Sequence, residues 1–441
     1  TSGAYWRGDE TREMLQRIYG VSFENVADLE AYVERLDEAK KRDHRKLGRE
    51  LDLFSVPEDA GPGLVHWHPK GATLRRVVED FWKAEHLKRG YELVDTPHIA
   101  KSALWHQSGH YQYYRENMYI LSVEGREYVL KPMNCPGHVL IYKSKMRSYR
   151  DLPIRYAEIG TVYRNERSGV LHGMLRVRGF TIDDGHIFCT SDQVQGELLG
   201  VVELAQFMMS AFGYSRYEVE LSVREPGDRE HYSGRDEEWE RAEEILREVL
   251  EVKGLPYRRV QGEAVFYGPK IDMKLIDALG RPWQGPTIQF DFNLPNRFEL
   301  EYIGPDNRPH QVVLIHRAIL GSLERFVGGL VEHYAGALPL WLSPVQVRVM
   351  AITDGQLEYA DSVHRRLIEE GIRSELDSRP EKVGFKIREA EEEKIPYMLV
   401  VGNKEVSSGT VSVRKRGGGD LGAEEVKKFI ARLRREDRKR L

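Results

Sequence analysis

The chain has 441 residues, which at roughly 150 residues per domain predicts about three domains. Its 66 basic and 70 acidic residues give a net charge of −4, so a nucleic-acid partner would have to bind local basic patches. The 41% of apolar residues exclude wholesale disorder, and no apolar run of about 18 residues predicts a membrane span. The first ten residues lack a signal-peptide pattern, and the two cysteines cannot form a disulfide framework. We therefore expect an intracellular, cytoplasmic protein.

Residues 1–50 are predicted to form a helical linker arm. Apolar side chains recur there at spacings of three and four, the period of an amphipathic helix. These side chains are Leu29, Tyr32, Val33, Leu36 and Ala39. A basic run follows at residues 40–46. It is typical of a solvated helix end, and the alternative is an arm that contacts phosphate groups.

Residues 51–338 predict an α+β domain with an antiparallel sheet, because strand-like runs and helical patterns do not alternate regularly. In the clearest run, Ile271, Met273 and Leu275 alternate with polar residues, the period of a half-buried strand. Other predicted strands lie at residues 128–130, 162–163, 288–292 and 312–315. Within residues 51–338 no G-x-G-x-x-G follows a strand and no G-x-x-x-x-G-K-[ST] occurs, so this domain supports neither the Rossmann nor the P-loop route to a nucleotide.

Residues 339–441 predict a second, smaller α/β domain after the proline-punctuated segment 338–344. Strand and helix patterns alternate there, which favours a largely parallel sheet. The predicted strands are residues 345–352, 372–376, 397–401 and 410–414, and the predicted helices are residues 357–371, 383–393 and from about 423 onward. The last 30 residues are strongly basic.

Three isolated residues could form a metal centre if the fold brings them together. Cys135 lies between two prolines, His186 follows an Asp-Asp-Gly sequence and His316 ends an apolar run. Each alone is more typical of a structural residue, whereas one thiolate and two imidazoles would hold zinc with an open, catalytic position. The pair His106 and His110 lacks the glutamate of H-E-x-x-H, and the intervening Ser-Gly sequence argues against one continuous helix.

Two arginines in apolar contexts, Arg164 and Arg325, form the second signal. Burying a guanidinium group is costly unless it is paired, so buried ion pairs are one interpretation. Because glycines lie nearby and no nucleophile does, clamping of phosphate groups by bidentate hydrogen bonds is the favoured alternative.

The order of three motifs resembles the class II aminoacyl-tRNA synthetases. Residues 73–97 resemble motif 1, residues 158–180 with Arg164 resemble motif 2, and residues 315–327 with Arg325 resemble motif 3. The sequences KPMNCPGH, LHGMLRVRGF, FYGPK and IHRAILGSLERF are similar to the threonyl-tRNA synthetase family in particular. The resemblance begins near residue 15 and continues to the C-terminus. It implies a class II catalytic core, an antiparallel sheet flanked by helices, at residues 51–338, and an anticodon-binding domain at residues 339–441.

The resemblance implies an ATP-dependent threonine–tRNA ligase with one Zn²⁺ per chain and Mg²⁺ bound with ATP. The implied zinc ligands are Cys135, His186 and His316, and the implied threonine contacts are Asp184, Tyr267, Gln289 and Met133. The implied ATP contacts are Arg164, Glu166, Arg176, Phe180, Gln284, Ser322 and Arg325. Catalysis is implied for Arg164, Lys270, Arg325 and His110, and anticodon contacts for Arg388, Glu405 and Arg414. A site that binds the threonine hydroxyl would reject valine, which lacks it.

The sequence also departs from the family at its front. Bacterial members carry roughly two more domains before the first matching segment, one of which hydrolyses seryl-tRNA. We therefore expect no editing in cis and a separate trans-editing protein; truncation of a longer protein is the alternative. Because motif 1 dimerises the catalytic domain in the family, the resemblance also implies a homodimer. Two other functions compete with the main one: a catalytically silent, tRNA-binding paralogue, and another class II synthetase such as a seryl or prolyl enzyme.

Overall fold

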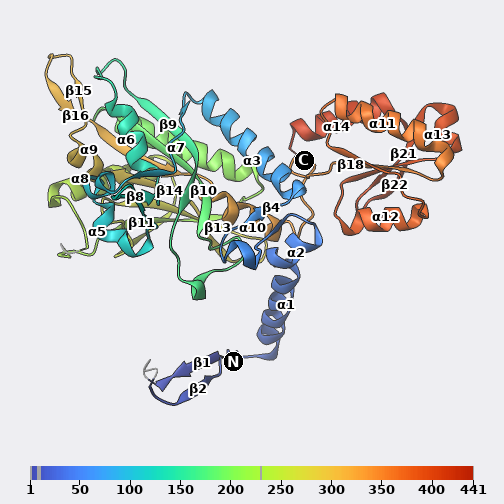
Figure 1. Cartoon of the computed structure of the whole chain (residues 1–441), viewed down its shortest axis with the longest axis horizontal. Coiled ribbons are helices and arrows are strands. Elements are labelled where there is room, and N and C mark those ends of the chain that lie inside the picture. Colours follow the sequence, from blue (N-terminus) through green and yellow to red (C-terminus); the bar gives the residue numbers. More distant parts are fainter. Residues whose placement is uncertain (1, 7–10, 229–230, 441) are drawn as a thin grey trace.

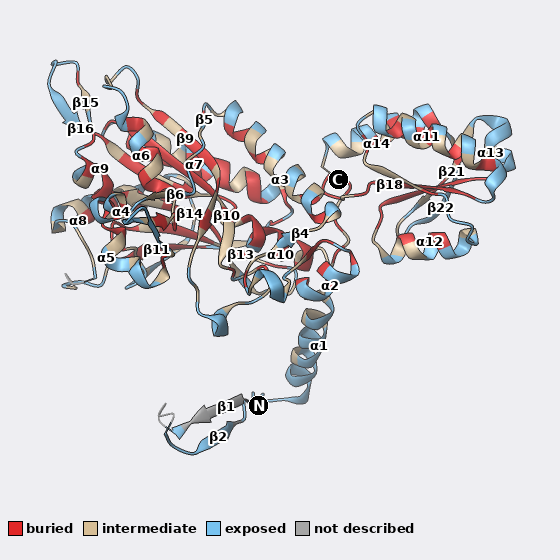
Figure 2. Ribbon diagram, viewed as in Figure 1, coloured by how far each residue is buried: buried red, intermediate tan, exposed pale blue. Residues whose placement is uncertain are grey.

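The computed structural model describes residues 2–6, 11–228 and 231–440. At the N-terminus, β1 (Ser2–Tyr5) and β2 (Met14–Arg17) pair antiparallel, followed by α1 (Val26–Arg42) and α2 (His44–Glu50). The helix predicted from the spacing of residues 29–39 is confirmed, but the prediction of a helical arm over residues 1–50 was wrong at residues 2–5 and 14–17, which form strands. The helix α1 projects from the rest of the molecule with no buried residue, as Figure 2 shows. In the described part of the chain, no helix is both long and apolar enough to cross a membrane.

An eight-stranded sheet forms the centre of the larger domain, on the left in Figure 1. Five of its seven strand pairings are antiparallel, which confirms the predicted antiparallel α+β core. In spatial order the strands are β12 (Tyr257–Gln261), β11 (Tyr217–Val223), β13 (Lys270–Ile276), β14 (Pro282–Asp291), β17 (Val313–Ala318), β10 (Gly179–Cys189), β9 (Ile154–Tyr163) and β5 (Glu92–Leu93). The alternation at residues 271–275 falls within β13, where Ile271, Met273 and Leu275 are all buried.

Four helices bury one face of this sheet in the largest hydrophobic core. They are α3 (Pro69–Lys88), α7 (Val194–Ala211), α8 (Asp236–Val252) and α10 (Leu323–His333). From the sheet, Ile187, Ile288 and Ile315 join that core, whereas the adjacent Phe188 and Leu314 belong to a second core on the opposite face. Because side chains alternate along a strand, polar residues next to these isoleucines point toward the second face.

The second face is covered by shorter elements. α6 (Cys135–Lys143) and α9 (Asn293–Phe298) pack there, beside a small sheet of β6 (Ile99–Lys101), β8 (Arg126–Leu130) and β7 (Ile120–Val123). His106 and His110 lie on separate helices, α4 (Ser102–Ser108) and α5 (His110–Tyr114), because Gly109 adopts a φ of 82° between them. The predicted break is therefore confirmed. The remaining short strands pair as β3 (Phe54–Ser55) with β4 (His66–Trp67), and β15 (Glu301–Ile303) with β16 (Pro309–Gln311).

The C-terminal domain has five strands in the order β19 (Ser374–Asp377), β18 (Val347–Ala351), β20 (Tyr397–Val401), β21 (Thr410–Lys415) and β22 (Gly419–Glu425). Its helices are α11 (Leu357–Glu369), α12 (Val383–Glu392), α13 (Asn403–Ser408) and α14 (Val426–Arg438). The prediction of a largely parallel sheet was wrong, since β20–β21 and β21–β22 are antiparallel. β22 was missed because its sequence, GDLGAEE, is rich in glycine and acidic residues and lacks apolar alternation.

Candidate active site

Strand register gathers the polar candidates on the second face of the central sheet. His186 on β10 lies opposite His316 on β17, and His316 lies opposite Gln289 on β14. Gln289 in turn lies opposite Lys270 on β13. Directly opposed side chains on neighbouring strands are about 4.5–5.5 Å apart at Cβ. Residues that are far apart in the sequence thus form one row across four strands.

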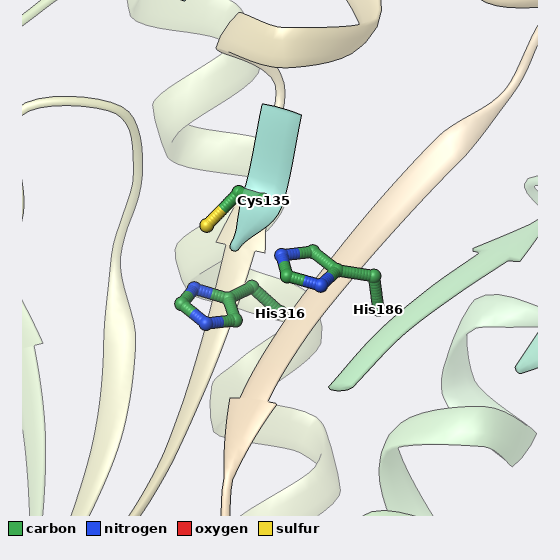
Figure 3. A group of neighbouring side chains, drawn as sticks. All are labelled: Cys135, His186 and His316. Atoms are coloured by element: carbon green, nitrogen blue, oxygen red, sulfur yellow. The ribbon is translucent and has the colours of Figure 1, made fainter. Parts of the chain in front are cut away.

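Cys135 completes a possible metal site above this row. It is the first residue of α6, and its Sγ lies with one ring nitrogen each of His186 and His316 in a group whose atoms are all within 4.8 Å of one another. Figure 3 shows the thiol and the two rings facing the same space. His186 Nε2 is buried and has no hydrogen-bond partner. A buried ring nitrogen without a partner is costly unless a ligand supplies the missing interaction, so the donor set fits a zinc ion.

Burial favours the neutral forms of the thiol and of one imidazole. It raises the pKa of Cys135 well above its usual range, and the Asp184 and Asp291 carboxylates raise it further. Burial likewise holds the pKa of His186 well below its usual value. A divalent cation would reverse this preference at the thiol, because metal coordination favours the thiolate.

A buried hydrogen-bond chain fixes which nitrogen of His186 faces the cavity. His138 Nε2 lies 3.0 Å from Glu158 Oε2, and Lys131 Nζ lies 3.1 Å from Glu158 Oε1. Burial raises the pKa of Glu158, but the His138 hydrogen bond and the Lys131 charge outweigh it and leave the pKa below its usual value. The ionised Glu158 therefore accepts from His138 Nε2–H, and His138 Nδ1 accepts from His186 Nδ1–H at 2.8 Å. This leaves a lone pair on His186 Nε2, the form in which imidazole binds metals.

Next to His316 lies a second polar group suited to a small amine or hydroxyl. Gln289 Oε1 accepts a hydrogen bond from Tyr267 at 2.6 Å and lies 2.7 Å from His316 Nδ1. Asp184 Oδ1 lies 2.8 Å from His316 Nε2, and Asn134 donates to Asp184 Oδ2 at 3.1 Å. Burial raises the pKa of Asp184, but the charge and hydrogen bond of His316 outweigh it and favour the carboxylate. An ionised, buried carboxylate is a suitable partner for an ammonium group.

The cavity beside these residues has a volume of about 300 Å³ and ends among arginines. Arg164 and Arg325 line that end, and the Arg164 guanidinium lies 5.1 Å from the centre of the Phe180 ring. Burial and the charges of Arg164 and Arg176 lower the pKa of Arg325. Clustered guanidinium groups repel one another unless an anion lies between them. The arginine end therefore suits a polyphosphate, and the Phe180 face suits an aromatic base.

Most residues implied by the resemblance meet at this cavity. Its lining includes Met133, Cys135, Arg164, Phe180, Asp184, Tyr267, Gln284, Gln289, His316, Ser322 and Arg325. His186 is grouped with Cys135 and His316 but does not itself line the cavity. Glu166 and Arg176 lie in the β9–β10 loop, where they pair with each other at 2.9 Å. Lys270 is paired with Asp272, whose other oxygen accepts from Gln284 at 2.9 Å.

His110 lies close to this group but is held differently. Its Nδ1 lies 2.8 Å from Ser108 Oγ, and its Nε2 is buried without a partner. Burial, with smaller contributions from the charges of His316 and Arg164, lowers the pKa of His110 to about 3. The ring is therefore neutral near pH 7, with a lone pair at Nε2 that can accept a hydrogen bond.

The three candidate anticodon residues lie on three elements of the C-terminal domain. Arg388 on α12 is 79% exposed and pairs with Glu392 at 2.9 Å. Arg414 on β21 lies 3.4 Å from Asp420. Glu405 on α13 accepts from the amide of Gly402 at 2.9 Å. The structure thus places all three in polar, largely local contacts.

Reasoning from the sequence missed the residues that hold the ligands. Lys131 and His138 belong to the KPMNCPGH sequence, but only Cys135 and Met133 were given roles there. His138 follows Cys135 by three residues on α6, so the helical period places both on one side of the helix. That spacing was the available signal.

Comparison with known proteins follows the division of the chain. A family model described as the tRNA synthetase class II core domain (G, H, P, S and T) matches residues 119–334, and a model described as an anticodon binding domain matches residues 346–436. The threonine–tRNA ligase of Caldanaerobacter subterraneus subsp. tengcongensis is 54% identical over 435 residues, 99% of this chain and 67% of the relative. That of Acidobacterium capsulatum is 54% identical over 98% of this chain and 63% of the relative. The chain thus spans about two thirds of the length of these relatives.

Solved structures are similar to this chain as well, and the one described here is matched over nearly its whole length. A crystal structure titled as the RNA binding domain of threonyl-tRNA synthetase from Cryptosporidium parvum Iowa II has a TM-score of 0.86 and 41% sequence identity. The similarity covers 89% of this chain and 98% of that one. The similarity therefore includes both the central sheet and the C-terminal domain.

Proposed function

The chain belongs to the threonine–tRNA ligase family of class II aminoacyl-tRNA synthetases, and on that premise we propose that it joins L-threonine to tRNA(Thr) at the expense of ATP. One observation carries the proposal. A single cavity is lined by Cys135 and His316, which are grouped with His186, and by Arg164 and Arg325. An amino acid and the phosphates of ATP would therefore lie side by side.

Cys135, His186 and His316 would hold Zn²⁺, with His138 and Glu158 fixing the tautomer of His186. When bound, the ion supplies an open position that the amino and hydroxyl groups of threonine can occupy. Asp184 supports this assignment, because its buried carboxylate can accept from the substrate ammonium. Tyr267 and Gln289 close the same end of the cavity. Valine offers no hydroxyl, so a site built on that group should reject it by a factor on the order of 10⁴.

Activation needs positioning and charge compensation from the chain. The threonine carboxylate oxygen forms a bond to the α-phosphorus, and the bond to the departing pyrophosphate breaks. Arg164 and Arg325 would offset the charge that develops on the phosphate oxygens, with Mg²⁺ bound to ATP. Phe180 would stack on the adenine, with Gln284 and Ser322 around the adenylate. Lys270 would reach the phosphates only after exchanging its ion pair with Asp272 for substrate.

Transfer to tRNA needs a group that receives a proton from the ribose hydroxyl at the 3′ end. The resemblance assigns this role to His110, whose buried Nε2 has no hydrogen-bond partner and so offers a lone pair to that hydroxyl. As that oxygen forms its ester bond to the threonyl carbonyl carbon, the bond to AMP breaks and AMP leaves. Arg388, Glu405 and Arg414 would contact the anticodon, where bidentate donors and an acceptor suit unstacked bases. We also propose that two copies of the chain form a homodimer.

Amino-acid-dependent exchange between ATP and pyrophosphate tests the proposal. Purified, zinc-loaded protein is assayed separately with threonine, serine and valine. Strong exchange with threonine, weaker exchange with serine, which keeps the hydroxyl, and none with valine is the expected pattern. Absence of exchange with all three amino acids from a folded sample would contradict the proposal. It would favour a catalytically silent, tRNA-binding protein.

A further inference from the structure

The basic run at residues 40–46 contains a buried histidine, His44. α1 ends within this run at Arg42 and α2 begins at His44, with Asp43 between them. The cations at the surface pair locally, as Lys41 does with Glu38 at 2.7 Å and Arg45 with Asp43 at 2.6 Å. His44 differs from its neighbours because none of its surface is exposed. Neither a solvated helix end nor a phosphate-binding arm requires a buried imidazole.

Both nitrogens of His44 are used, and their partners define the tautomer. The backbone N–H of Met174 donates to His44 Nε2 at 3.1 Å. Nε2 therefore carries a lone pair, and Nδ1 carries the proton that it donates to Glu332 Oε1 at 2.7 Å. Glu332 Oε2 is held in turn by Arg281 at 2.6 Å. The ring is thus a fixed bridge between α10 and the backbone of Met174.

Met174 lies in the middle of the β9–β10 loop, which carries the proposed ATP contacts Glu166 and Arg176. The loop makes a tight turn in which the N–H of His172 donates to the carbonyl of Arg176 at 3.1 Å. His44 approaches this turn so closely that a Cβ added to Gly173 would lie 2.1 Å from its Nε2. Gly173 also has a φ of 50°, which few other residues adopt at low cost.

The turn is held from the nucleotide side as well. Arg325 Nε donates to the carbonyl of Leu175 at 3.0 Å, and Arg176 extends from the turn to Glu166. Arg325 lines the cavity. The β9–β10 loop is therefore fixed at two adjacent residues: His44 holds Met174, and Arg325 holds Leu175. A shift at either one would move Arg176.

We propose that His44 is a positioning residue for ATP: its Nε2 holds the β9–β10 loop so that Arg176 and Glu166 are placed at the nucleotide. The inference rests on the proposed function for the identity of the nucleotide. Its physical core, the hydrogen bond from Met174 to His44 Nε2, does not depend on that function.

Substitution of His44 by Gln or by Asn tests its two hydrogen bonds separately, the one from Met174 at Nε2 and the one to Glu332 at Nδ1. Gln in place of His44 can present an oxygen near the position of Nε2, and Asn can present an N–H near the position of Nδ1. We expect His44→Gln to keep the ATP KM within about threefold of wild type, and His44→Asn to raise it about tenfold, the effect of one lost hydrogen bond. The KM for threonine should stay unchanged in both. Lys41→Ala, in the same basic run and paired with Glu38, is the control and should behave as wild type.

Hydrogen–deuterium exchange of the Met174 amide gives a readout that needs no activity. We expect this amide to be protected in the wild-type protein and in His44→Gln, and to exchange about tenfold faster in His44→Asn. Rapid exchange at Met174 in the wild type, or equal ATP KM values for the Gln and Asn variants, would overturn the inference. If both variants unfold, protection of Met174 in the wild type, strengthened on addition of ATP, still decides it. Failure of the wild type to support pyrophosphate exchange would instead count against the proposed function.

Discussion

In the central domain the candidate ligands are buried together, whereas in the C-terminal domain the candidate anticodon contacts are exposed or half-buried and are held only by local polar contacts. Cys135 and His186 are 3% and 0% exposed, and His186 is held by a buried hydrogen-bond chain through His138 to Glu158. Arg388 is 79% exposed and pairs with Glu392 on its own helix. A buried polar group must have its partners in place before substrate binds, because leaving it unpaired costs about 1–3 kcal/mol. An exposed arginine pays almost nothing to exchange one partner for another.

The contrast shows what would determine recognition of the amino acid in one domain and of the RNA in the other. In the central domain, recognition is built into strand register, since His186, His316 and Gln289 face one another across three strands. In the C-terminal domain, recognition would be completed by the RNA itself, around side chains held only by local contacts. Substitutions in the first region should therefore have larger effects than those in the second.

The largest effect should come from removing a ligand. We expect Cys135→Ala to lower the zinc content from about one ion per chain to near zero. Pyrophosphate exchange with threonine should then fall by more than about 100-fold, because even outer partners of a zinc site are worth 10–100-fold. Metal analysis and the exchange assay measure the two effects. Cys189→Ala is the matched control, since Cys189 is also fully buried but belongs to the helix-packed core. Equal loss in both variants would mean that the cavity does not use the thiol.

An intermediate effect is expected at His138, which contacts no substrate. His138→Ala removes the acceptor of the His186 Nδ1–H, so the tautomer of His186 is no longer fixed. Zinc affinity should fall by about 10–100-fold while the fold is retained. Competition with a chromogenic chelator measures this affinity. His106→Ala, at an exposed histidine stacked on Tyr111, should leave it unchanged. Unaltered affinity in His138→Ala would show that the buried chain is structural only.

The central domain also shows which features of the structure can be predicted from the sequence and which cannot. Alternation at residues 271–275 predicted the strand β13 correctly, and its polar residue Asp272, which is also buried, accepts from Gln284 and Thr287 in the cavity wall. Convergence of Cys135, His186 and His316 could not be derived from spacing, because it depends on pairing between β10 and β17. It followed only from the resemblance to a family. His138 and His44 were missed for a related reason: a histidine that orients another group has no pattern of its own until its partners are known.

The C-terminal domain should show a smaller and more selective effect. Arg388→Ala is expected to lower kcat/KM for tRNA about tenfold, within the range for one bidentate contact to a base. Pyrophosphate exchange should stay at the wild-type level, because Arg388 lies outside the central domain. Arg365→Ala is a close control: Arg365 is an exposed arginine paired four residues away with Asp361 on α11. Equal loss for both variants would indicate a general effect of surface charge.

The smallest effect should appear in the pH dependence of the free energy of unfolding, which should again differ between the central and the C-terminal domain. His86 on α3 is fully buried, and its Nδ1 lies 2.7 Å from the carbonyl of Trp82. Burial, helped by the charge of Arg317, lowers the pKa of His86 to about 2, whereas an unfolded histidine titrates near 6.5. Between these values the unfolded chain binds the extra proton. The stability that His86 contributes is therefore complete above pH 6.5 and is lost progressively as the pH falls below it.

The free energy of unfolding of the wild type should thus fall by about 1.4 kcal/mol more between pH 7.5 and 5.5 than that of His86→Phe. Urea unfolding of both proteins at the two pH values measures this difference. Phe keeps a ring against Trp82, whose centre lies 3.9 Å from that of His86, and removes only the titration. His66→Phe, at an exposed histidine, should leave the wild-type difference intact. The C-terminal domain has a single histidine, the partly buried His364, so acid should loosen the central domain first. If the C-terminal domain unfolded before the central domain on acidification, this expectation would be wrong.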